Sequence, residues 1–167
     1  MHIHRPKSLP AVLLACCMAA QAADDGHHAP EQGVEALSAP LREALGAEMV
    51  ALQNGLMTVI PAFVAGHWDE VAGIARRMHD SYIMKQSLSA AQVEELHQAM
   101  PAAFLALDAR FHYLAGMLQH AAEARKPELV GFYLGRLAET CATCHAQHAR
   151  GRFPAYAEPA ASDEHDH

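Results

Sequence analysis

Residues 127–149 read PELVGFYLGRLAETCATCHAQHA, and this stretch decides the fold that the sequence predicts. Apolar side chains recur in it at three- and four-residue steps, the period of a helix with one buried face. The residues expected on that face are Val130, Tyr133, Leu134, Leu137, Cys141, Cys144 and His145. Two thiols and an imidazole are therefore expected on the core side of a helix, close to its end.

Cys141-Ala142-Thr143-Cys144-His145 matches the Cys-x-x-Cys-His sequence at which a c-type haem is attached. In such a site both thiols bond to the porphyrin and the histidine ligates the iron. The rival interpretations are a thioredoxin-like redox pair, half of a zinc site, and chance. A redox pair opens a helix after a strand, and structural zinc needs four ligands. The motif thus favours one covalent haem c on Cys141 and Cys144, with His145 as the proximal iron ligand.

Three more main helices are predicted upstream. Ser38 can cap the first, and Pro61 should kink or end it. Its apolar stripe comprises Leu41, Leu45, Met49, Leu52, Leu56, Val59 and Phe63. After a turn at Gly66 and His67, anchored by Trp68, the second helix runs from about Trp68 to Lys85.

The third main helix follows a short one. Ser89 and Gln92 resemble a capping box that opens a helix through about Ala99. Pro101 fits the first turn of the third main helix, whose core positions are Phe104, Leu107, Phe111, Leu114 and Leu118. The expected fold is all-α: an antiparallel four-helix bundle with haem attached near the end of the last helix.

Residues 1–22 have the features of a secretory signal peptide. A basic start precedes an apolar run, and Ala20-Gln21-Ala22 is a good cleavage site. This predicts export and a periplasmic location, and no later segment is judged long and apolar enough to cross a membrane. The alternative is lipoprotein cleavage, with acyl chains on Cys16.

The remaining chain divides into three parts. Residues 23–38 are expected to form a flexible arm, 39–157 the bundle, and 158–167 a disordered acidic tail. The histidines of the arm and tail could bind a metal weakly, although solvated termini are favoured; they are His27, His28, His165 and His167.

The charge of the chain bears on its partners. Loss of Arg5 and Lys7 with the signal leaves ten of the twelve basic residues against nineteen acidic ones, a formal charge of −9. Such a surface disfavours nucleic acid and acidic membranes. A redox partner with a basic patch fits it better, although the charge on its own can equally serve solubility.

The four helical patterns, with the haem motif near the end of the last, resemble the class II c-type cytochromes, the cytochrome c′ family with its methionine-ligated low-spin relatives. The resemblance covers roughly residues 39–153. It implies covalent haem on Cys141 and Cys144, proximal ligation by His145, and a propionate contact from Arg42. It also makes an antiparallel homodimer through the first two helices a candidate assembly.

One part of the chain departs from the family pattern. An aromatic residue and then an Arg commonly stand three and four places after the ligand histidine. Here His148 and Ala149 occupy those places, and Arg150 comes one residue later. The basic contact beside the haem is therefore in doubt.

The sixth iron position separates the functions that the family offers. The first helix generally supplies the distal residue, and Met49 is the candidate ligand at the expected depth. Met is also a common core filler. Counting back from Gly66 instead places Val50 near the iron, which leaves the metal five-coordinate. His79 and His112 are further candidates, but hydrogen-bonded or partly exposed histidines are favoured there.

The leading hypothesis is a mono-haem cytochrome that carries single electrons and is not an enzyme. The alternative is a five-coordinate haem protein that binds NO or CO. A haem peroxidase is the weakest hypothesis, because no distal His and Arg pair can be assigned.

Overall fold

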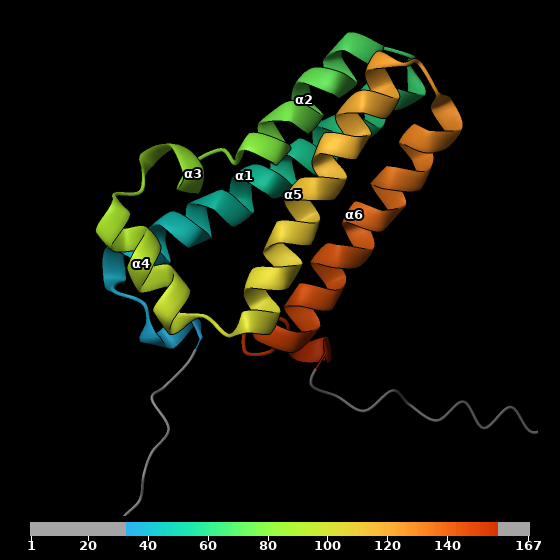
Figure 1. The fold of residues 1–167 in the computed structure, drawn as a ribbon. Coiled ribbons are helices and arrows are strands. Elements are labelled where there is room, and N and C mark those ends of the chain that lie inside the picture. Colours follow the sequence, from blue (N-terminus) through green and yellow to red (C-terminus); the bar gives the residue numbers. More distant parts are fainter. Residues whose placement is uncertain (1–32, 157–167) are drawn as a thin grey trace, which may run out of the picture.

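The computed structural model describes residues 33–156, which are all-helical (Figure 1). The long helices are α1 (Ala39–Val64), α2 (Trp68–Asp80), α5 (Ala102–Glu123) and α6 (Pro127–His148). Between α2 and α5 lie the short helices α3 (Met84–Ser87) and α4 (Ala90–Ala99). Two 3-10 turns flank the helices, η1 (Val34–Ala36) and η2 (Pro154–Tyr156). The predicted signal peptide and the predicted acidic tail lie outside the described residues.

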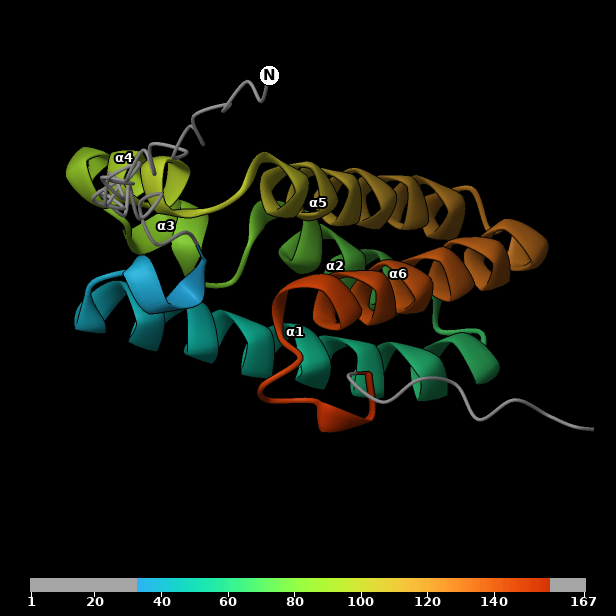
Figure 2. The ribbon, with the colours of Figure 1, turned by 90° about the horizontal axis from the view of Figure 1, so that it is seen from below.

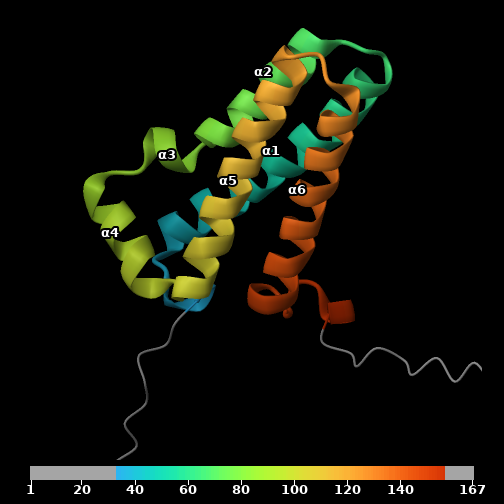
Figure 3. The same ribbon diagram turned by 45° about the vertical axis from the view of Figure 1, so that its right-hand side comes forward.

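Successive long helices run in opposite directions, as Figures 1 and 3 show. The main contacts join α2 to α5, α5 to α6 and α1 to α2. Seen from below, α1 and α5 lie on opposite sides, with α2 and α6 between them (Figure 2). The C-terminal part of α1 approaches the start of α6, where Phe63 lies against Gly131. The α3–α4 connection lies beside the N-terminal part of α1.

Apolar side chains form two clusters, which we call the central and the end cluster. The central cluster joins the four long helices; it comprises Leu52, Val59, Ala62, Val71, Ile74, Ala75, Met78, Phe111, Leu114, Ala115, Leu118, Ala121, Ala122, Val130 and Leu137. The end cluster lies where α1 and α5 begin; it comprises Leu37, Leu41, Leu45, Met100 and Phe104. Half-buried residues of α3 and α4 pack against the end cluster.

The buried stripe of α1 agrees with the prediction at four of its seven positions and is displaced by one residue at the other three. Its members are Leu41, Leu45, Glu48, Leu52, Gly55, Val59 and Ala62. Met49, predicted on the stripe, lies beside it and is 37% exposed, whereas Glu48 is 2% exposed. Pro61 does not end α1, which continues to Val64. The missing N–H of this proline costs one helical hydrogen bond near an end, where the loss is tolerated.

The turn after α1 agrees with the prediction. Gly66 takes the left-handed conformation, with φ of 72°, that glycine accepts without a steric penalty. Trp68 then opens α2 and packs its ring against Phe63, with centroids 6.1 Å apart. The aromatic pair ties the start of α2 back to the end of α1.

The second helix is shorter than predicted. It ends at Asp80 rather than near Lys85, and Ser81 takes φ of 64°, which a helix cannot continue. The next three backbone N–H groups, of Tyr82, Ile83 and Met84, donate to the Glu48 carboxylate at 3.0, 2.6 and 3.2 Å. A buried anion on α1 thus caps the start of α3, and it satisfies groups that an unbroken α2 would have bonded internally.

The side-chain N-cap predicted for α4 forms, whereas the one predicted for α1 does not. The capping box of Ser89 and Gln92 forms as predicted. Ser38 does occupy the N-cap of α1, but its side chain caps nothing. Its N–H and hydroxyl instead bind the Glu95 carboxylate of α4, at 2.6 and 3.2 Å. The longer-range contact replaces the local one and ties α4 to the start of α1.

Six residues of the predicted arm, 33–38, are within the described range. They contain η1, and Leu37 is 2% exposed in the end cluster. The packed part of the chain therefore includes residues assigned to the arm, because Leu37 adds buried apolar area to that cluster.

One expectation about membranes needs correction. Among the described helices, α1 is long and apolar enough to cross a membrane by length and composition. This is weak evidence, because core helices of soluble proteins pass the same test. The structure buries one stripe of α1 against the rest of the chain and leaves Val50, Met57, Ile60 and Val64 exposed.

Candidate functional site

The last two turns of α6 carry the Cys-x-x-Cys-His residues. Cys141, Cys144 and His145 are three and four residues apart on one helix, so their side chains share a face. Both cysteines are free and half-buried. The helix is regular to its end, where the N–H of Ala149 donates to the His145 carbonyl oxygen at 3.0 Å. The sequence prediction of this arrangement is confirmed at the level of the helix and its face.

The two thiols contact different parts of the core. Cys141 packs against the central cluster, whereas Cys144 packs against the end cluster. The motif thus lies at the junction of the two clusters, where α6 passes the starts of α1 and α5. A group bonded to both sulfurs would contact both clusters.

Burial sets the protonation states at the site. Burial raises the pKa of Cys141, and burial together with Cys141 and Asp108 raises the pKa of Cys144 to about 11. Burial, and to a smaller extent Arg152, lowers the pKa of His145 below its ordinary value. At neutral pH the thiols are therefore protonated and the imidazole is neutral, which is the form of histidine that ligates a metal.

Aromatic rings flank the end of α6. Phe153, from the turn after the helix, stacks on His145 with centroids 4.4 Å apart and planes at 14°. Phe104 of α5 meets His148 edge-on at 5.7 Å. Nε2 of His148 is buried and has no hydrogen-bond partner within residues 33–156. Buried polar atoms almost always have a hydrogen-bond partner, and none of the described side chains supplies one for this nitrogen.

These residues fit a covalently attached haem. Two free thiols and a neutral imidazole share one face, and this face adjoins apolar side chains that suit a porphyrin. His148 adds a buried nitrogen able to hydrogen-bond a polar group there. By contrast, no three His, Cys, Asp or Glu side chains within the described range are placed to bind a metal ion together.

The candidate residues on α1 lie outside its buried stripe. Met49 is 37% exposed and Val50 is 52% exposed. Arg42 donates from its guanidinium to the carbonyl oxygen of Glu35 in η1, at 3.1 Å. Arg42 and Met49 are seven residues apart and therefore lie on one side of the helix, along the flank of the stripe.

His79 and His112 link α2 to α5. Nδ1 of the buried His112 donates to the carbonyl oxygen of Met78 at 2.8 Å. Nδ1 of His79 donates to the carbonyl oxygen of His112 at 3.0 Å. Because a carbonyl oxygen only accepts, each Nδ1 carries a proton. The favoured expectation of hydrogen-bonded histidines is thus confirmed for both residues.

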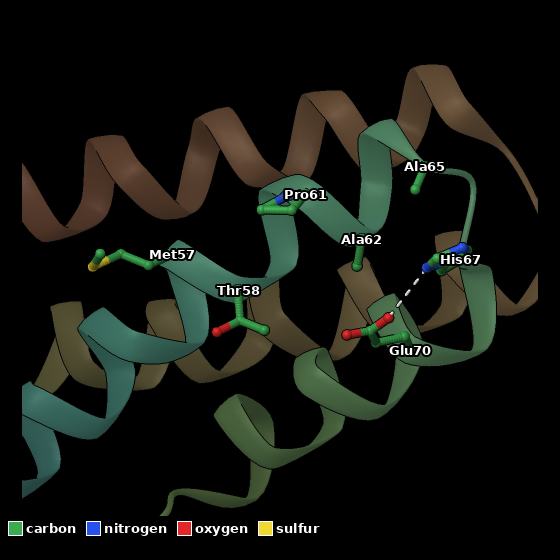
Figure 4. A pocket seen from close by; sticks show the side chains of 7 residues that line it. All are labelled: Met57, Thr58, Pro61, Ala62, Ala65, His67 and Glu70. Carbon is green, nitrogen blue, oxygen red and sulfur yellow. Dashed lines mark ion pairs between the residues drawn. The ribbon is translucent and has the colours of Figure 1, made fainter.

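A shallow depression elsewhere on the surface has a different character. A cavity of about 470 Å³ lies between α1 and α2, lined by Met57, Thr58, Pro61, Ala62, Ala65, His67 and Glu70 (Figure 4). His67 and Glu70 pair across its rim at 3.4 Å. None of its lining residues belongs to α6, so it is separate from the Cys-x-x-Cys-His face.

The sequence did not predict the contacts that Phe153 and His148 make at this site. Phe153 follows the end of α6, and outside a helix or strand the sequence does not indicate where a side chain points. His148 was noted only as a departure from the family pattern. Aromatic residues in the turn after a ligand-bearing helix were the available signal for Phe153.

No protein-family model, curated protein or solved structure matches the chain.

Proposed function

We propose that this protein is an exported mono-haem c-type cytochrome that carries single electrons. The observation that carries the proposal is the half-buried face of α6, which bears two free thiols and an adjacent neutral imidazole. Cys141 and Cys144 would hold the porphyrin through thioether bonds, and His145 would ligate the iron. Bound in this way, haem supplies one-electron redox chemistry at its iron.

The chain's own residues would surround the haem and keep its histidine ligand neutral. The apolar side chains of both clusters would cover one side of the bound group and keep water from it there. Burial keeps the His145 imidazole unprotonated and so available as a ligand. As part of the same proposal, α1, α2, α5 and α6 form the antiparallel four-helix bundle of the class II c-type cytochromes. Its location would be the periplasm. Its partner would be a redox protein with a basic patch, attracted by an exported chain with ten basic and nineteen acidic residues.

Intact mass and absorption spectra test the attachment. The full chain, produced in a host competent for c-type maturation, should gain the mass of one haem that survives denaturation. The matched variant Cys141→Ser/Cys144→Ser should lose it. A wild-type mass equal to that of the polypeptide alone would refute the proposal.

A second candidate function is a five-coordinate haem protein that binds NO or CO. It is favoured by the exposure of Met49 and Val50, 37% and 52%, because a side chain outside the buried stripe of α1 offers the iron no fixed sixth ligand. If the absorption spectrum of the reduced holoprotein is low-spin and does not change on adding CO, it would support electron transfer with a side-chain ligand. A high-spin spectrum that changes on adding CO would support the gas-binding function.

Met49→Leu identifies the side chain responsible. If Met49 is the distal ligand, this variant should turn a low-spin spectrum into a CO-sensitive one. The control is Met57→Leu, an exposed methionine two turns further along α1, which should leave the spectrum unchanged. Identical spectra for wild type and Met49→Leu would exclude Met49 as the ligand.

A further inference from the structure

The turn after α6 brings an aromatic ring back onto the proposed iron ligand. Past His148 the N–H groups of Arg152 and Phe153 both donate to the carbonyl oxygen of Ala149, at 3.0 Å. The N–H of Tyr156 then donates to the carbonyl oxygen of Phe153 at 3.1 Å. Figure 2 shows this segment leaving the end of α6 and turning toward the side on which α1 lies. The result is the parallel stack of Phe153 on His145.

The stack supplies an orientation that the histidine lacks by itself. Rotation of an imidazole about its Cβ–Cγ bond has only broad preferences, so the ring plane needs an external restraint. A hydrogen bond from the second ring nitrogen usually provides it. Within residues 33–156, however, neither ring nitrogen of His145 makes such a bond. The ring contact found there is the one with Phe153.

Parallel stacking restrains the ring without blocking its chemistry. Phe153 covers a face of the imidazole, because the planes are only 14° apart. The lone pair that binds a metal lies in the ring plane and points from its edge. The contact therefore limits rotation and leaves the coordinating edge of His145 free.

Phe153 has no evident role in either apolar cluster. It is half-buried and belongs to neither the central nor the end cluster, nor to the residues packed around them. A ring kept for core packing would contact those side chains. Its position is instead explained by the imidazole that it covers.

We infer that Phe153 is a positioning residue that fixes the plane of the His145 imidazole. The inference rests on the proposed function, since it assigns the residue that orients the proximal ligand of a covalent haem. It acts through His145 and touches no reacting atom. The stack is formed by these two side chains alone, so we expect it in the haem-free chain as well.

Three variants of the full-length holoprotein test this role. Phe153→Leu keeps an apolar side chain but removes the ring, and Phe153→Tyr keeps the ring. The control Phe132→Leu alters an exposed phenylalanine of α6. The ferric electron paramagnetic resonance spectrum reports the orientation of the axial imidazole. We expect Phe153→Leu to replace the single wild-type signal by a broadened or doubled one with shifted g values. Phe153→Tyr and Phe132→Leu should match the wild type.

A second measurement uses the haem-free protein. The ring current of Phe153 should shift the His145 ring protons upfield in its proton NMR spectrum, and Phe153→Leu should abolish that shift. Absence of the shift in the wild type would overturn the inference.

The outcomes separate the two proposals. A wild type without covalent haem defeats the proposed function and, with it, the role of Phe153. A loaded wild type with the same ferric spectrum as Phe153→Leu defeats only the role of Phe153. A loss of signal definition shared by Phe132→Leu would also overturn it, because the effect would then not be specific to the stack.

Discussion

At the scale of single residues, two side chains show how burial shapes chemistry in this protein. Glu48 is an anion with a 2% exposed surface, and it is stabilised there by three backbone N–H donors. Cys144 has no such compensation. Burial and the nearby Cys141 and Asp108 therefore keep it a neutral thiol.

Removal of the Glu48 carboxylate should destabilise the fold strongly. Glu48→Ala leaves the N–H groups of Tyr82, Ile83 and Met84 without their acceptor, and we expect the free energy of unfolding to fall by about 3 kcal/mol. Urea titration followed by circular dichroism measures it. The matched control is Glu43→Ala, at an exposed position of α1, which should change stability by less than about 0.5 kcal/mol. Equal effects of the two variants would refute this role of Glu48.

The raised pKa of Cys144 predicts slow alkylation of the haem-free folded protein. Its pKa of about 11, against 9.0 for an ordinary thiol, makes the reactive thiolate scarce at pH 8. Iodoacetamide should react about 100-fold more slowly than with the urea-unfolded chain at that pH. The rate should rise with pH up to about 11. Peptide mass spectrometry across the pH series measures this, and a rate that levels off near pH 9 would contradict it.

At the scale of elements, α1 explains both the success and the failure of sequence analysis. The ends of α6 and the capping box of α4 were predictable, because residues close in sequence determine them. The burial of Glu48 in place of Met49 on α1 was not, because apolar side chains surround much of this helix and mark no single face. Its buried carboxylate serves a partner 34 residues away, Tyr82, and sequence periodicity carries no trace of such a pairing.

Long-range contacts decide where α2 ends, and an irregular turn completes the site on α6. The apolar pattern continues past Asp80 to Tyr82 and Ile83, yet these residues leave the helix to bind Glu48. The Cys-x-x-Cys-His face was predictable from spacing alone. The stack of Phe153 on His145 was not, because it depends on the path of an irregular turn.

Two glycines of α1 should respond oppositely to alanine. A Cβ at Gly55 would lie 2.7 Å from the Tyr82 hydroxyl and 2.8 Å from Cε of Met78, whereas one at Gly46 meets nothing within 4 Å. Gly55→Ala should lower the free energy of unfolding by about 1–2 kcal/mol through overpacking. Gly46→Ala should raise it by about 0.5–1 kcal/mol, since alanine favours a helix interior. Thermal and urea unfolding of both variants measure the signs, and a common sign would contradict this packing of α1 on α2.

At the scale of the whole molecule, the two apolar clusters divide the described chain into a firmer and a looser part. The central cluster draws on all four long helices, and α5 alone contributes six of its residues. The α4 helix has no buried residue and packs through half-buried side chains such as Leu96. Its ties to the rest of the fold include the pair of hydrogen bonds between Ser38 and Glu95.

Hydrogen exchange should reveal this division. Amides of α4 should exchange through local opening and show protection at least about tenfold lower than amides in the middle of α5. Exchange followed by mass spectrometry of peptic fragments from the haem-free protein measures the difference. Equal protection in the two helices would mean that the clusters open as one unit.

Because Cys141 and Cys144 lie at the junction of the two clusters, their position affects whether attachment or folding must come first. Once both clusters have closed, each sulfur is partly covered and uncharged. If haem is attached as we propose, the attaching enzyme must therefore reach both sulfurs while the polypeptide is still unfolded. Under that proposal, a chain that folds before attachment would be a poor substrate, and the yield of haem-loaded protein would depend on the relative rates of folding and attachment.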